Sequence, residues 1–123
     1  MERGIITINE HGIVFIPNGE IWMNEMELED LFGVIAPTVC AAIRAIYKSG
    51  VLKEHETQKY IQLENRYYAD VYNFPMVAAL AFRINSYGAG QVRNILLERM
   101  YLRKEKTNIY FSLNMDEKAS PMN

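Results

Sequence analysis

The chain has 123 residues, half of them hydrophobic, which is enough for one domain with its own core and excludes a chain that stays disordered. The net charge of −2 selects no class of partner, and the single cysteine, Cys40, excludes an internal disulfide, as expected for a reducing compartment. The N-terminal residues do not resemble a signal peptide, and the longest strongly apolar stretch, residues 76–82, is too short to cross a bilayer. We therefore expect a cytoplasmic protein without a membrane partner.

The charges are unevenly distributed along the chain. Residues 1–43 carry seven acids and one base, whereas residues 44–106 carry eleven bases and six acids. A difference of this size between two parts of one domain predicts a face that tolerates anions and a face that repels them.

The first elements are predicted to be strands. Residues 5–8 and 13–16 are rich in β-branched side chains, and residues 9–12 between them form a turn, so we expect a β-hairpin. Residues 21–23 are expected to add a short third strand.

Two helices follow. Asn24 is a good N-cap, and Glu27 stands three residues later, which is the spacing of a capping box. Gly33 ends this short helix. Pro37 begins the next one, because the first turn of a helix does not need its missing N–H, and residues 49–50 end it.

This pair of helices predicts a helix-turn-helix. Gly33 supplies the backbone freedom for a tight turn, and Val34 and Val39 would fill the angle between the helices. An ordinary corner between two helices is the alternative. The order of turn, buried valine and a later hairpin favours the helix-turn-helix, since a winged helix has its wing at that hairpin.

The second half of the chain completes an α+β fold. Residues 57–63 and 67–72 are predicted to form the wing hairpin. The residues expected to face one another across it are Ile61 and Leu63 on one strand and Tyr67, Ala69 and Val71 on the other. A third helix starts at residues 73–75 and a fourth spans residues 89–104. The core positions predicted for the fourth helix are Val92, Ile95, Leu96 and Met100.

The fold class is therefore a winged-helix-like helix-turn-helix with an N-terminal β-hairpin, a wing hairpin and two C-terminal helices. Residues 1–106 form the domain. Residues 107–123 are expected to be a tail with at most one short strand, at residues 109–111. Arg83, in an otherwise apolar helix, is expected to have a structural hydrogen-bonding role.

Several short segments resemble a known family. They are Ile21-Trp22, Leu31-Phe32-Gly33-Val34, Thr38-Val39, Val71-Tyr72-Asn73-Phe74, Phe82-Arg83-Ile84-Asn85-Ser86, Ala89 and Arg93. With these residues the chain resembles the N-terminal domain of the RhuM ("virulence protein RhuM") family and, more distantly, the Bro-N type of phage and viral DNA-binding modules. The resemblance covers most of residues 13–102. It implies a winged-helix-like module of mobile elements and bacterial genomes that acts on DNA.

Two functions follow from these residues. The first is DNA binding, and the residues expected to contact DNA are Thr38, Arg44, Lys48, Lys53, Lys59 and Arg66. Where the family usually has Ser and Arg at the start of the second helix, this chain has Ile35, Ala36, Pro37, Cys40 and Ala41. These side chains favour the alternative, a module that docks a protein partner or a second copy of itself.

Catalysis is not expected. His11 and His55 are far apart and in no metal-ligand spacing, and Cys40 has no His or Asp near it in sequence. We therefore expect no catalytic residue, no metal, no cofactor and no small-molecule substrate.

Overall fold

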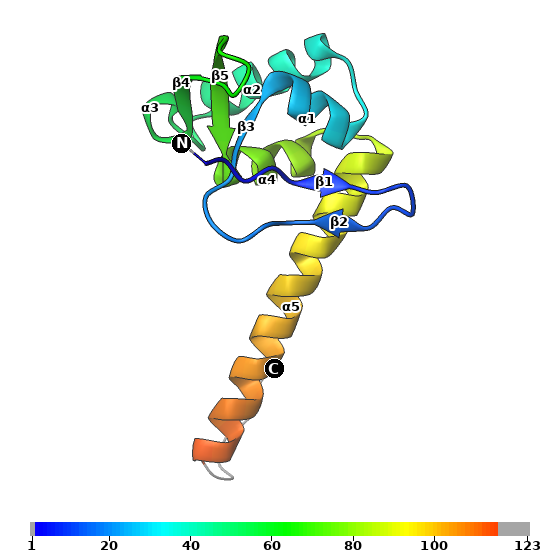
Figure 1. Cartoon of the computed structure of the whole chain (residues 1–123). Helices are drawn as coiled ribbons and strands as arrows, with labels where there is room; N and C mark the ends of the chain where they lie inside the picture. Colours follow the sequence, from blue (N-terminus) through cyan, green and yellow to red (C-terminus); the bar gives the residue numbers. More distant parts are fainter. Residues whose placement is uncertain (1, 116–123) are drawn as a thin grey trace. The chain divides into compact units, whose positions relative to one another are not determined.

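A computed structural model describes the backbone of residues 2–115 and the side chains of residues 2–102 (Figure 1). It is a mixed α+β structure with an N-terminal hairpin, a three-stranded antiparallel sheet and two C-terminal helices. The elements are β1 (Thr7–Ile8), β2 (Val14–Phe15), β3 (Trp22–Asn24), α1 (Glu25–Phe32), α2 (Ala36–Ser49), α3 (Glu54–Thr57), β4 (Gln58–Gln62), β5 (Tyr68–Asn73), α4 (Phe74–Arg83) and α5 (Tyr87–Met115). One compact unit runs to Arg93, and a second begins at Asn94.

The N-terminal hairpin is confirmed. β1 and β2 pair antiparallel, and the side chain of Asn9 accepts hydrogen bonds from the backbone amides of His11 and Ile13, which holds the turn between them. The third strand also exists, but it does not extend this hairpin. β3 pairs with β5 instead, across about fifty residues of chain.

The α1–α2 corner has the predicted local chemistry. Asn24 and Glu27 form the capping box, with both hydrogen bonds at 2.8 Å. Gly33 has φ +65°, a left-handed conformation that glycine adopts without strain. Three residues separate α1 from α2, and the two helices are bent by 106°. Val39 is fully buried in this angle, whereas Val34 is only half-buried.

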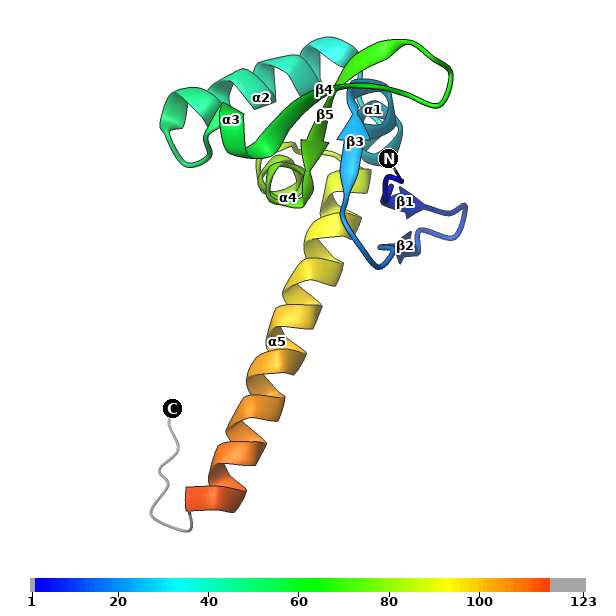
Figure 2. The ribbon, with the colours of Figure 1, turned by 60° about the vertical axis from the view of Figure 1, so that its left-hand side comes forward.

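The sheet has the order β3-β5-β4 (Figure 2). The strand β3, which precedes the two helices, therefore lies beside β5, the last strand in sequence and the central strand of the sheet. The predicted register of the β4–β5 hairpin is confirmed. Ile61 pairs with Ala69, and the Leu63 amide donates to the Tyr67 carbonyl at 2.8 Å. The short helix α3, which leads from α2 into β4, was not predicted.

The core of the first unit lies among α1, α2, α4, the sheet and the first turns of α5. Its largest fully buried side chains are Ile6, Leu28, Phe32, Val39, Met23, Val71, Met76, Val77, Leu80 and Val92. Most of them come from apolar stripes at helical spacing, which is why α1, α2 and α4 were predictable as helices.

The junction between α4 and α5 differs from the prediction. Ser86 accepts from the Ala89 amide and donates to the Phe32 carbonyl, so α5 begins at Tyr87, two residues earlier than expected. Arg93 donates to the carbonyl oxygens of Ala81, in the last turn of α4, and of Ile84, its C-cap residue. The structural role that we predicted for Arg83 therefore belongs to Arg93, because Arg83 is exposed.

In the second unit the backbone is helical as far as Met115. Residues 109–111 are helical here, not a strand, and α5 continues past residue 104, where the fourth helix was expected to end. Met100 is exposed, so its predicted place in the core is wrong, and Ile95 and Leu96 are only half-buried. Among the described residues, no single helix is long and apolar enough to cross a membrane; α1 and α2 meet that test only when taken together across their 106° bend.

Candidate nucleic-acid interface

The first turn and a half of α2 presents small and apolar side chains to solvent. Ile35, just before the helix, is 68% exposed, and Pro37, Thr38 and Ala41 are exposed as well. The opposite side of the helix carries the buried residues Val39, Ala42, Ile43 and Ile46. Hydrogen bonds to base edges require polar side chains, and Thr38 is the one that this exposed segment offers.

Cys40 and Ala36 lie at the edge of this surface and are half-buried. The Cys40 thiol donates to Glu25 Oε2 at 3.0 Å. This hydrogen bond, together with burial, raises the pKa of the Cys40 thiol above its ordinary value. The thiol is therefore held in its protonated form, which is the weakly nucleophilic one.

Three exposed cations follow along the same helix and the loop after it. Arg44 and Lys48 continue the exposed stripe of Pro37 and Ala41 at helical spacing, and Lys53 precedes α3. None of the three cations forms an ion pair within the part of the chain whose side chains are described. These three cations are the candidates for phosphate contacts on and beside α2.

Lys59 is placed on the other side of the sheet. Gln58, its neighbour in β4, accepts from the Tyr47 hydroxyl of α2 at 3.0 Å, so Gln58 faces α2. Side chains alternate along a strand, and Lys59 therefore faces away from α2. Its ammonium lies 4.2 Å from the centre of the Trp22 ring, a cation–π contact.

Arg66 is the turn residue of the β4–β5 hairpin. It has φ +76°, a left-handed conformation that is uncommon outside glycine, and its side chain is exposed. The six residues predicted to contact DNA are thus not one surface. Thr38, Arg44, Lys48 and Lys53 belong to α2 and the loop after it, Arg66 to the hairpin turn, and Lys59 to the far face.

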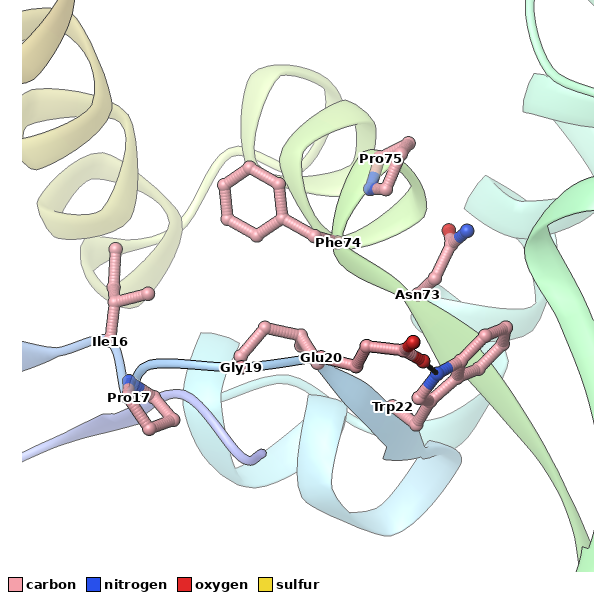
Figure 3. A pocket seen from close by; sticks show the side chains of 9 residues that line it. Ile16, Pro17, Gly19, Glu20, Trp22, Asn73, Phe74 and Pro75 are labelled. Atoms are coloured by element: carbon pink, nitrogen blue, oxygen red, sulfur yellow. Dashed lines mark hydrogen bonds between the residues drawn. The ribbon is translucent and has the colours of Figure 1, made fainter. Parts of the chain in front are cut away.

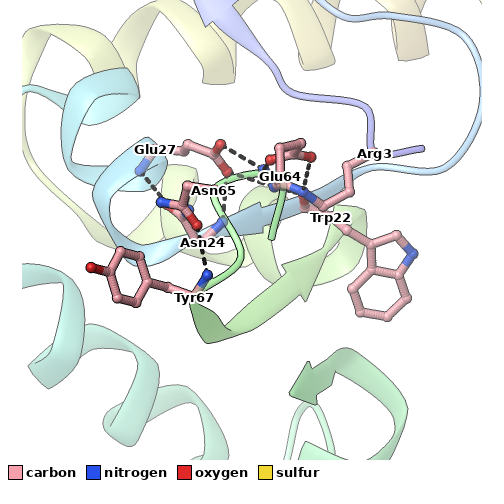
Figure 4. Close-up of polar contacts among 7 residues, drawn as sticks. All are labelled: Arg3, Trp22, Asn24, Glu27, Glu64, Asn65 and Tyr67. Carbon is pink, nitrogen blue, oxygen red and sulfur yellow. Dashed lines mark hydrogen bonds and ion pairs between the residues drawn. The ribbon is translucent and has the colours of Figure 1, made fainter. Parts of the chain in front are cut away.

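A buried arginine that the sequence prediction missed neutralises part of the acidic N-terminal half. Arg3 donates to both carboxylate oxygens of Glu27 at 2.8 and 3.0 Å, to Glu64 at 3.1 Å and to the Trp22 carbonyl at 2.7 Å (Figure 4). Arg3 is the only lysine or arginine among the first 43 residues, which carry seven acids. This imbalance was the one sequence signal that Arg3 pairs with a carboxylate.

Two hollows flank these surfaces. One, of about 250 Å³, lies beside α2 and combines Arg44 with the carboxylates of Glu25 and Glu54. The other, of about 390 Å³, lies between the loop before β3 and the start of α4, and Phe74 and Pro75 form part of its apolar wall (Figure 3). Its Trp22 indole donates to Glu20 at 2.8 Å.

The candidate catalytic side chains lie apart from one another. His11 pairs with Glu10 and His55 with Glu56, and both pairs are exposed. Within the residues described, no group of three or more His, Cys, Asp or Glu side chains is placed to hold a metal ion. Comparisons of the chain with protein-family models, curated proteins and solved structures find no match.

Proposed function

We propose that this chain is a DNA-binding regulatory module of the winged helix-turn-helix type, which contacts phosphates and reads base sequence weakly. The observation that carries the proposal is the α1–α2 corner. Its three-residue turn and 106° bend fall in the range of DNA-binding helix-turn-helix motifs, and its second helix carries Arg44 and Lys48 without ion partners among the described residues.

Two further features support it. In the strand order β3-β5-β4 the β4–β5 hairpin pairs with the strand that leads into α1, which is consistent with a wing, and Arg66 stands at its turn. The resemblance of residues 13–102 to the RhuM family and to Bro-N type modules favours DNA as the ligand and a mobile-element or bacterial origin, and the single cysteine favours action in the cytoplasm. The role is binding rather than catalysis.

Weak readout follows from the exposed start of α2. Lysine and arginine contacts to phosphates position a protein without selecting a sequence, and Thr38 alone offers a hydrogen-bonding side chain in the segment that would meet base edges. With about four phosphate contacts, log affinity should fall with log salt at a slope near −3.6, from roughly 0.9 per neutralised phosphate.

The test is fluorescence anisotropy of a labelled DNA duplex at several salt concentrations. Replacing Arg44 and Lys48 by Ala should flatten the slope by about two contacts, or roughly 1.8. Lys59→Gln is the matched control, because Lys59 faces away from α2 and should leave the slope unchanged. Absence of binding at low salt, or an equal effect of Lys59→Gln, would exclude this proposal.

Protein docking through the start of α2 is the second candidate. The observation that favours it is the exposure of Ile35, at 68%, next to Pro37 and Ala41, since exposed apolar side chains that gather in one place mark interaction surfaces. A second copy of the chain is the partner that can be tested directly. Sedimentation of the parent and of Ile35→Asp should then differ, with the parent associating and the variant monomeric.

A further inference from the structure

Within the residues that the structure describes, one edge of the central strand β5 has no neighbouring strand over half of its length. β3 ends at Asn24, opposite Val71, because Asn24 is also the N-cap of α1 and the chain turns into the helix there. β5 begins three residues before Val71. Tyr68–Asp70 therefore pair with β4 on one side and have no strand from the described residues on the other.

The backbone groups along this edge point outward. The Leu63 amide donates to the Tyr67 carbonyl, so Tyr67 directs its carbonyl toward β4, while its amide donates to Asn65 Oδ1 in the turn. Direction alternates along an antiparallel strand, and Tyr68 and Asp70 consequently direct their N–H and C=O groups to the unpaired side. Such an edge can accept another strand by main-chain hydrogen bonds.

A hollow of about 400 Å³ lies against this edge, between the hairpin and the start of α1. Apolar and aromatic side chains form much of its wall: Tyr67 is 75% exposed, and Tyr68 and Met26 are also well exposed. Large exposed apolar side chains gathered around a concave surface are typical of binding sites.

The polar part of the wall combines the amides of Asn24 and Asn65 with two carboxylates. Glu25 and Asp70 line the hollow, and neither forms an ion pair with another residue whose side chain is described. Burial, and then the nearby carboxylates of Asp70 and Glu25, raise the pKa of the Tyr72 hydroxyl, which also lines this hollow. A cation between carboxylates and tyrosine faces gains from both, whereas a phosphate would be repelled.

We propose that this edge of β5 binds an extended protein segment, which adds to the sheet as a strand and places a lysine or arginine side chain in the hollow between Glu25 and Asp70. The free main-chain groups of Tyr68 and Asp70 account for the extended conformation, and the tyrosines and carboxylates account for the cationic side chain. This inference does not depend on DNA binding, because Arg44 and Lys48, the two cations that the DNA test replaces, lie on α2, outside the hollow.

The experiment uses three labelled peptides and the full chain, with affinity read from fluorescence anisotropy. The first peptide alternates valine with arginine, the second replaces arginine by glutamate, and the third is the arginine peptide with alternate backbone amides methylated. The arginine peptide should bind. The glutamate peptide should not, because its charge repels Glu25 and Asp70, and the methylated peptide should not, because it cannot pair with β5.

Variants of the chain test the site itself. Glu25→Gln combined with Asp70→Asn should weaken the arginine peptide by about tenfold, from two partly exposed charge contacts. Asp30→Asn is the matched control, since it removes one charge from α1 outside the hollow and should have a smaller effect than either single replacement. Circular dichroism confirms that each variant is folded.

Three results would overturn the proposal. They are equal binding of the arginine and glutamate peptides, full binding of the methylated peptide, and an unchanged affinity in the double variant. A single-stranded oligonucleotide that displaces the arginine peptide from the parent, and does so more effectively from the double variant, would assign the hollow to nucleic acid and would also exclude the proposal.

Discussion

Replacing Arg3 by Met should destabilise the first unit more than the loss of a surface arginine does. The Arg3 side chain is only 3% exposed, and its guanidinium holds Glu27 and the Trp22 carbonyl at hydrogen-bonding distance. Methionine keeps an apolar stem of similar length but removes every donor. Glu27 would then remain next to apolar surface without its cation.

The expected loss of unfolding free energy depends on how well water can solvate the Glu27 carboxylate once Arg3 is gone. Removing one member of a fully buried ion pair costs about 3–5 kcal/mol. The Glu27 side chain is 22% exposed and keeps its capping-box hydrogen bond to Asn24, so we expect a smaller loss, of about 2–3 kcal/mol. Glu64 is 69% exposed, and its contact with Arg3, screened by solvent, adds little.

Acid should reveal the contact with Glu64. The hydrogen bond from Arg3 holds the pKa of the Glu64 carboxyl below its ordinary value of 4.5. A depressed carboxyl pKa stabilises the fold above that ordinary value, and this contribution is lost as the pH falls below it. The parent should therefore lose this part of its stability below about pH 4.5, and Arg3→Met should not.

Urea unfolding followed by the fluorescence of Trp22, the only tryptophan, measures both effects. A double-mutant cycle with Glu27→Gln isolates the Arg3–Glu27 contact from any loss of packing. A loss below about 1 kcal/mol at neutral pH, or a coupling energy near zero, would show that Arg3 is held by packing and not by its carboxylates.

Two further predictions concern α5 and Cys40. Gly88→Ala should lower the unfolding free energy by about 1–3 kcal/mol, because its methyl group would overlap the Leu31 carbonyl oxygen; Gly90→Ala, with only a flexible side-chain end nearby, should melt no lower than the parent. Cys40 should alkylate slowly with iodoacetamide at mildly alkaline pH, and Glu25→Gln should speed the reaction, since it removes the main cause of the raised thiol pKa. An unchanged alkylation rate in Glu25→Gln would contradict that cause.

Sequence patterns predicted the features that are set within a few residues of chain. The capping box at Asn24, the left-handed turn at Gly33 and the hairpin after α3 are each specified by neighbours, and each was found where expected. Contacts between distant segments were not predictable in this way. Arg3 and Glu64 are 61 positions apart, and only the folded chain brings them together.

The candidate site was predictable to the same extent. The 3.6-residue period of α2 identifies its exposed side, and Ile35, Pro37 and Ala41 are exposed as that period requires. The side of the sheet on which Lys59 lies could not be predicted from sequence alone. Strand alternation places the side chains of Lys59 and Gln58 on opposite faces of β4, but only the hydrogen bond from Tyr47 to Gln58 shows which face is turned toward α2. The prediction that Met100 is buried was wrong for a related reason: helical spacing identifies an apolar position, but the position is buried only where another element covers it.

The contacts of Arg3 with Glu27 and Glu64 should affect the two proposed binding surfaces, the cations of α2 and the hollow beside β5, in different ways. Through Glu27 and Glu64, Arg3 joins the start of α1 to the turn of the β4–β5 hairpin, and these are the two elements that form the walls of the tyrosine-lined hollow. We therefore expect the width of that hollow to depend on Arg3, which lies outside it. The cations of α2 have no such dependence, because Arg44 and Lys48 belong to one continuous helix. Phosphate contacts and peptide binding should thus respond to different residues, which makes the two proposals separable in one protein.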